Sequence, residues 1–180
     1  MILVVFLDAR GQFFSPDLIV AVAVFVFALM IFFSASNSIF SQVSSLDERR
    51  GIDEAGHLVT NELVLSGGQP SNWENMPLDS AFSLGLAQSD NSLSSGKAVT
   101  FVHELNDSTQ YPKIKEKLGL GPFDLYFRLV DSSGAVISYG GSPLAGGVSI
   151  SDPQLSFSYK RLVLFNGSPA VLDAVLSLAK

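Results

Sequence analysis

The chain has 180 residues, of which 47% are hydrophobic, and its formal net charge is −6. This length suits one modest domain together with a membrane segment. The excess of acidic over basic residues, 17 against 11, argues against a nucleic-acid partner, and the absence of cysteine excludes disulfides, thiolate metal sites and cysteine nucleophiles.

The most apolar stretch is residues 18–33, which contain no charge, glycine, proline or hydroxyl group. As a helix this stretch covers roughly 24 Å, which is short of the ~30 Å hydrocarbon core of a membrane. Flanking apolar residues extend it, so we expect a transmembrane segment over about 18–36. A secretory signal peptide cleaved near Ser34 and Ala35 is an alternative, although Asp17 at the mouth of the apolar run is unusual for one.

The predicted helix continues beyond the apolar stretch. Apolar residues recur at steps of three and four as far as Val64, which predicts one face of a helix, and the turn at residues 66–68 ends it. We therefore predict one helix over about residues 17–65, transmembrane in its lower half and amphipathic in its upper half. Residues 1–7 are apolar but too short to span a membrane, so they are either an unusual leader or sequence upstream of the true start codon.

Residues 66–180 are predicted to form a β-rich globular domain, with Trp73 pinning a turn-rich segment to its core. The Asn166-Gly167 pair is the strongest hairpin signal in the chain. The long helix is expected to pack on an antiparallel meander, an α+β fold. The expected elements are strands at 81–87, 123–131, 135–139, 155–165 and 170–178, a polar loop at 88–96, a strand or short helix at 97–105, and a helix at 111–118.

Few residues in the chain have the pattern of a catalytic or metal-binding site. His57 and His103 lie far apart without metal-ligand spacing, and no GxSxG, P-loop or HExxH motif occurs, so we expect no metal, no cofactor and no enzymatic activity. The three lysines within residues 113–117 are expected to form a solvated helix face. Asn106 and Asn166 begin Asn-x-Ser sequons, which permit N-glycosylation and fit an exported domain.

Two regions resemble archaeal type IV pilin-like proteins. The first is the segment Arg10-Gly11-Gln12, followed by Ser15, Asp17 and the apolar helix. It is similar to the family's leader and its mature start, Q-x-S-x-E, although Ser15 and Asp17 each sit one place later and Asp replaces Glu. The second region is similar to a domain common in secreted archaeal pilin-like proteins, and the resemblance lies in residues 65–74, 83–87, 111–120 and 123–129.

The resemblance implies a leader over residues 1–11, removed after Gly11 by a prepilin-type peptidase, and a mature chain that begins with a helix over residues 12–65. Residues 66–180 would then be extracellular, and the chain would be a structural subunit, major or minor, of a type IV pilus-like filament or pseudopilus formed with other pilin-like subunits. Asp17 would pair with the α-amine of Gln12 in a neighbouring subunit, or cap its own helix.

A different function stays open at this point. The chain could be an unprocessed single-pass membrane protein that displays an extracellular binding or adhesion module. The two functions differ in the expected N-terminus of the native protein, which is Gln12 for a processed subunit and the intact leader for an unprocessed anchor.

Overall fold

The structure, a computed structural model, describes residues 16–179, without the side chains of residues 16–18 and 37–45. It divides into two compact units, Met1–Asp47 and Glu48–Lys180. Helix α1 (Pro16–Leu65) is continuous over 50 residues, which confirms the predicted helix. Proline is well tolerated at the first position of a helix, where its missing N–H has no partner to lose.

The C-terminal turns of α1 belong to the core of the unit Glu48–Lys180. Ile52, Val59 and Leu63 are fully buried and follow one another at helical spacing, which confirms the amphipathic stripe read from the sequence. The helix ends at Leu65, and three residues later Gly68 adopts a positive φ of 77°, where a Cβ would lie only 2.5 Å from Cδ1 of Trp73.

The segment after α1 contains two short 3-10 helices, η1 (Trp73–Asn75) and η2 (Leu78–Ser80). Trp73 is 1% exposed and its Nε1 donates to the Gly85 carbonyl at 2.9 Å, so this aromatic does pin the segment. The strand predicted at 81–87 is wrong. The backbone N–H of Leu86 instead donates to the Leu63 carbonyl at 2.9 Å, so this stretch satisfies the end of α1 rather than joining a sheet there.

One mixed sheet of six strands, in the order β1-β2-β7-β8-β3-β6, forms the second layer. The predicted antiparallel meander is wrong in two respects: β8 lies between β7 and β3, and β2 pairs with β7 in parallel. β8 lies near the centre of the sheet, and its inward residues Ala170, Leu172, Ala174 and Leu176 are all buried. The polar loop predicted at 88–96 holds the β1–β2 hairpin. The strands are β1 (Ala87–Ser89), β2 (Ser92–Leu93), β3 (Asp124–Val130), β6 (Ala145–Gly147), β7 (Leu155–Phe165) and β8 (Ser168–Leu178), and a separate ribbon pairs β4 (Ser138–Tyr139) with β5 (Ser142–Pro143).

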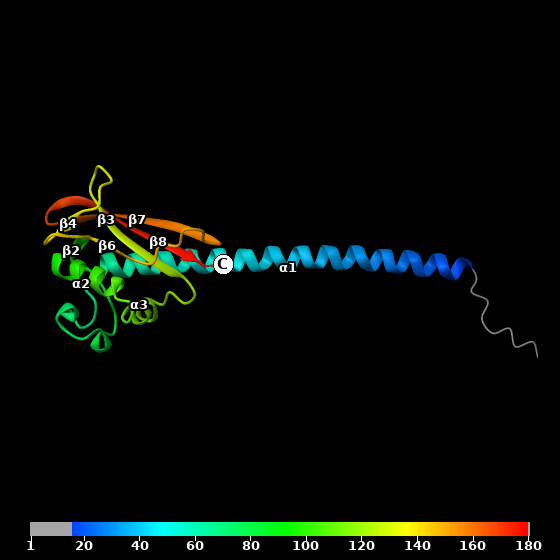
Figure 1. Ribbon diagram of the computed structural model, residues 1–180, viewed down its shortest axis with the longest axis horizontal. Coiled ribbons are helices and arrows are strands. Elements are labelled where there is room, and N and C mark those ends of the chain that lie inside the picture. The colour runs from blue at the N-terminus through cyan, green and yellow to red at the C-terminus, as the bar shows by residue number, and fades with distance from the viewer. Residues whose placement is uncertain (1–15, 180) are drawn as a thin grey trace, which may run out of the picture. The chain divides into compact units, whose positions relative to one another are not determined.

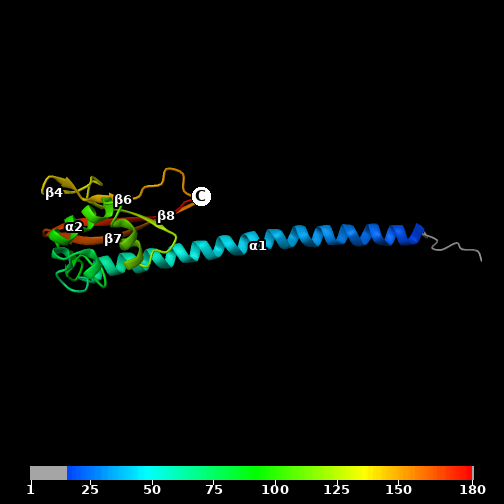
Figure 2. The ribbon, with the colours of Figure 1, turned by 60° about the horizontal axis from the view of Figure 1, so that its bottom comes forward.

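Helices α2 (Ser95–Asn106) and α3 (Tyr111–Lys117) lie on the same side of the sheet as the C-terminal turns of α1 (Figure 1). Figures 1 and 2 both place the β7–β8 hairpin alongside those turns. The segment that the sequence left open between strand and helix is α2, because the Ser94 side chain accepts from the backbone N–H of Lys97 and caps a helix. The inner face of the sheet therefore carries the core, which includes an edge-to-face contact of Phe101 with Phe127.

We predict that Gly56→Ala destabilises the globular unit. An added Cβ would lie 2.1 Å from Cε2 of Tyr159, whose hydroxyl is held by the Ile52 carbonyl at 3.1 Å. The ring is buried and cannot move aside freely, and overpacking of this kind costs about 1–3 kcal/mol.

Gly51→Ala is the matched control on the same helix, because its Cβ would make an ordinary 3.5 Å contact with Phe123. We expect it to gain up to about 1 kcal/mol from helix propensity. Urea unfolding of the full chain in detergent, followed by the fluorescence of Trp73, the one tryptophan in the chain, measures both changes. Equal midpoints for the two variants would contradict the close packing of α1 on β7.

Candidate functional site

The apolar part of α1 is the first candidate site. Ile19–Ser36 is a helical segment long and apolar enough to cross a membrane, and it is the one such helix in the described part of the chain. Its large apolar side chains are exposed all around the helix, from Ile19 to Phe33, and none is covered by another described element of the unit Met1–Asp47. A helix that is apolar on every side needs lipid or other helices around it.

The residues predicted to control processing lie at the start of the chain. Gly11 and Gln12 are outside the described residues, so their predicted roles stay predictions. Asp17 is the second residue of α1. That position suits a carboxylate, because the N-terminus of a helix carries partial positive charge.

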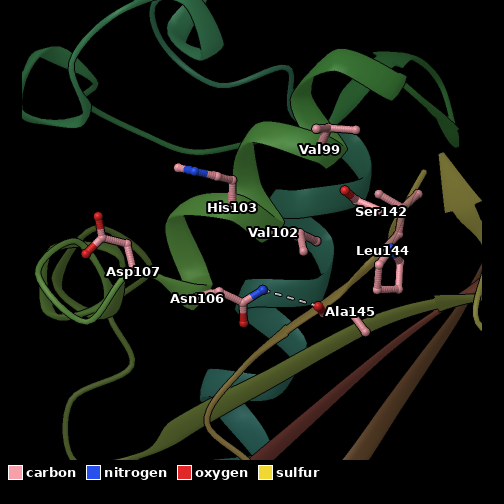
Figure 3. Close-up of a pocket in the computed structure, with 9 residues that line it drawn as sticks. Val99, Val102, His103, Asn106, Asp107, Ser142, Leu144 and Ala145 are labelled. Atoms are coloured by element: carbon pink, nitrogen blue, oxygen red, sulfur yellow. Dashed lines mark hydrogen bonds between the residues drawn. The ribbon is translucent and has the colours of Figure 1, made fainter. Parts of the chain in front are cut away.

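A hollow of the globular unit lies between α2 and the segment that carries β5 and β6, with a volume of about 410 Å³. Figure 3 shows Val99 and Val102 of α2 on one side and Ser142 and Leu144 on the other. The floor is apolar, because Leu144 is almost fully buried and Val102 is 6% exposed. The hollow therefore offers an apolar base with polar groups around it.

The polar groups around this hollow are used within the fold. Asn106 donates through Nδ2 to the Ala145 carbonyl at 3.4 Å and accepts from the Gly147 N–H at 3.2 Å, so it closes the free edge of β6 (Figure 3). The carboxylate of Asp107 accepts from the hydroxyl and the backbone N–H of Thr109, and these hydrogen bonds lower its pKa. The arrangement suits binding of a small apolar or mixed group.

The remaining residues singled out in the sequence are spread over the globular unit. Asn166 lies at the exposed tip of the β7–β8 hairpin with φ of 51°, and Asn106 is on α2. His57 and His103 lie 3.7 and 3.6 Å from carboxylate oxygens on their own helices, and no cluster of three metal-ligating side chains occurs among the described residues.

The expected solvated lysine face is wrong. Each of the three lysines of α3 reaches another element: Lys113 pairs with Asp79 at 2.8 Å, Lys115 pairs with Asp124 at 2.8 Å, and Lys117 donates to a carbonyl before the β1 strand. These contacts tie α3 to the segment between α1 and β1 and to β3.

Sequence reasoning missed an ion pair on the outer face of the sheet, in which an exposed arginine meets a buried carboxylate. Asp173 of β8 is 1% exposed, and its carboxylate accepts from Nε and Nη2 of Arg128 at 2.9 and 2.7 Å and from the Ser158 hydroxyl at 2.7 Å. Alternation in β3 and in β8 predicts that Arg128 and Asp173 each point away from the core. It does not predict that β8 lies beside β3, which is what brings the two side chains together. The buried carboxylate thus has a charged partner and a hydroxyl donor in place of water.

Besides Tyr111 of α3, whose pKa is raised by burial, two groups beside the C-terminal turns of α1 have raised pKa values. Burial raises the pKa of Glu62 above its usual value, and a hydrogen bond from the Leu84 N–H only partly offsets this. Burial and the neighbouring Asp53 carboxylate raise the pKa of Tyr159 to about 12. Neither group faces the hollow beside α2, so both shifts reflect the packing of α1.

We predict that Glu62→Gln stabilises the unit at pH 7. The folded-state pKa of Glu62 is raised, so folding favours the protonated carboxyl, and stability is lost as the pH rises through that pKa. Glutamine removes this loss and keeps an acceptor for the Leu84 N–H. The gain in unfolding midpoint should be present at pH 7 and should vanish below about pH 4.5, where both states are protonated.

Glu54→Gln is the control, because Glu54 is exposed on the same helix and the substitution makes the same change in net charge. Thermal unfolding of both variants across this pH range tests the prediction. A gain for Glu62→Gln that is the same at every pH would contradict it.

No model of a known protein family matches the chain, and neither a curated protein nor a solved structure shows significant similarity to it. The proposals below are therefore argued from the residues of this chain.

Proposed function

We propose that the chain is a pilin-like structural subunit, major or minor, of an extracellular type IV pilus-like filament or pseudopilus. The observation that carries this proposal is α1 itself. Its segment Ile19–Ser36 is apolar all round, whereas its C-terminal turns are the central core element of an α+β unit. This division is what a subunit needs if one helix is to pass from lipid into a polymer while its folded domain stays intact.

Lipid and the interior of a helical bundle are similar surroundings for this segment. Both are apolar, so the same side chains can face acyl chains before assembly and neighbouring helices afterwards. Large apolar residues fill the whole surface of Ile19–Ser36, which suits close packing with several helices rather than with one. The subunit would thus reside in the membrane until it is assembled, with the unit Glu48–Lys180 outside the cell.

Processing and assembly are assigned to the residues before the apolar segment. A prepilin-type peptidase would cut after Gly11 at the cytoplasmic face, where a residue without a side chain lets the backbone enter its site. The new α-amine of Gln12 would then meet Asp17 of a neighbouring subunit. A carboxylate inside an apolar bundle must be paired, so this contact would set the axial register of the filament.

The hollow beside α2 favours a second candidate function. Its apolar floor and polar rim are features of sites that bind small groups. In this case the chain would be an unprocessed single-pass membrane protein displaying a binding or adhesion module. The N-terminal mass of the native protein separates the two.

We predict that Gly11→Leu blocks processing. The native chain should then keep residues 1–11, which mass spectrometry of the purified protein detects, whereas the unaltered chain should begin at Gln12. Ala9→Leu is the control, because it adds the same bulk within the leader but not at the cut. A native chain that retains its leader without any substitution would overturn the proposed processing.

We predict that Asp17→Ala abolishes filaments but leaves membrane insertion and processing unchanged. The variant lacks the carboxylate that pairs with the Gln12 amine, while its apolar segment is intact. Electron microscopy of cell appendages and membrane fractionation are the measurements. Asp8→Ala, which alters an acid on the leader side of the cut, should assemble normally. Normal filaments from Asp17→Ala would contradict the pairing.

A further inference from the structure

The strand β7 has a neighbouring strand on only one side for most of its length. β8 pairs with all of β7, whereas β2 pairs only with Leu164 and Phe165. The Leu164 N–H donates away from β8, to the Asn91 carbonyl at 2.7 Å. Since successive residues of a strand direct their main-chain groups to opposite edges, the alternate residues before Leu164 also direct theirs away from β8. These residues are Ser156, Ser158, Lys160 and Leu162.

We call the main-chain N–H and C=O groups of these four residues the open edge. No element in the described part of the chain pairs with the open edge, and all four residues are exposed. The pairing of β7 with β8 has no bulge, and β7 contains no proline, so the open edge is regular and keeps every donor. The main chain of another extended strand complements such a row of donors and acceptors.

A second copy of β7 is the strand that this chain itself can supply. The other strands at the edges of the described sheets are short, since β1 and β6 have three residues each and β4 and β5 have two. The free side of β6 is moreover closed by Asn106. Two β7 strands that pair antiparallel are self-complementary, so one contact satisfies the open edges of both copies.

Lys160 limits the register of such a pair, because like charges directly opposite each other are destabilising. When Ser158 lies opposite Ser158 of the second copy, Lys160 lies opposite Ser156 and is about 14 Å from the other Lys160 along the strands. On the inner face the same register sets Phe157 opposite Tyr159, and an aromatic cross-strand pair is favourable. The register centred on Ser158 therefore uses the open edge without setting like charges opposite each other.

The pairing also fixes the directions of the two α1 helices. The contacts of α1 with β7 advance along both elements in the same order, from Glu48 with Gln154, through Asp53 with Tyr159, to Asn61 with Arg161. The C-terminal turns of α1 therefore run in the same direction as β7, and an antiparallel pair directs the two helices oppositely. Each helix continues at its Glu48 end toward Ile19–Ser36. Copies whose helices enter facing surfaces can meet in this way, whereas neighbours in one membrane cannot.

We propose that the β7 strands of two copies pair antiparallel, centred on Ser158, and so join chains that come from facing surfaces. The inference rests on the extracellular position that the proposed function gives to the unit Glu48–Lys180. One contact of this length is weak, but many copies on each surface raise its avidity. The globular unit would thus link surfaces that carry the same chain.

Single cysteines test the register, because the chain has none of its own. The full chain is reconstituted in vesicles and oxidised. Ser158→Cys should give a disulfide-linked dimer, since the two positions lie opposite each other with Cα atoms about 5.5 Å apart. Ser156→Cys is the matched control in the same exposed row, and it should stay monomeric because its counterpart lies about 14 Å away. Combining Ser156→Cys with Lys160→Cys should restore the dimer.

Two vesicle populations test the direction of the pairing. One population carries the Ser158→Cys chain, and the other carries the same chain with a C-terminal tag that raises its mass. Mixing the populations before oxidation should give a dimer of tagged and untagged chains. Dimers formed only within one population would overturn the proposal. A Ser158→Cys chain that stays monomeric would overturn it too, as would a Ser156→Cys chain that dimerises equally.

Charge substitutions are the second arm of the test, with clustering of vesicles as the readout. Ser156→Lys sets a lysine opposite Lys160 and should abolish clustering, whereas Ser156→Glu sets a carboxylate there and should keep it. Leu162→Lys is the control, because it adds the same charge as Ser156→Lys on the same strand but beyond the paired residues, and it should cluster normally. Equal clustering of all three variants would contradict the register.

The vesicle experiments need neither processing nor filaments, which keeps this inference separate from the proposed function. An intact leader on the native protein would reject the proposed function, and the Ser158→Cys dimer would still decide on the pairing. Native filaments from a chain that gives no such dimer would reject the pairing alone.

Discussion

The burial of one stripe of α1 against the sheet is the constraint on which the globular unit depends. Ile52, Val59 and Leu63 have no exposed surface, and Gly56 between them allows Tyr159 of β7 to approach the helix backbone. The end of the helix is closed by the segment that follows it, through the bond from Leu86 to the Leu63 carbonyl. Without this helix the inner face of β7 would lose its cover, so the helix is an integral part of the fold.

The same helix therefore meets two kinds of surroundings. Over Ile19–Ser36 every face is apolar, while beyond Glu48 one face is apolar and the opposite face carries exposed charges such as Glu54. The free energy of burying the first part is available only from lipid or from other chains, because no described element of its own unit packs on it. The second part is stabilised within the chain. A helix built in this way can change its surroundings at one end without unfolding at the other.

Much of this fold could be predicted from local patterns. α1, α3, β3 and β7 have strong periodicity, and Asn166-Gly167 supplies the positive φ values that the β7–β8 turn requires. Strand order could not be predicted, because the pairing of β8 with β3 joins strands that are far apart in the sequence, which local periodicity does not report. The strand predicted at 81–87 failed for a similar reason: its apolar residues pack on the end of α1. Of the predicted processing and assembly residues, only the helical position of Asp17 falls within the described chain.

The outer face shows why the surface could not be read from the sequence. Alternation in β7 predicts that one set of side chains faces solvent, but it does not say which neighbours share that face. With β8 between β7 and β3, the apolar residues line up in one row, and the next row holds Lys160, Asp173 and Arg128. Asp173 is held by Arg128, and the Asp131 carboxylate lines the same hollow as Lys160, so charges of both signs border the apolar row and only the strand pairing shows which of them are neighbours.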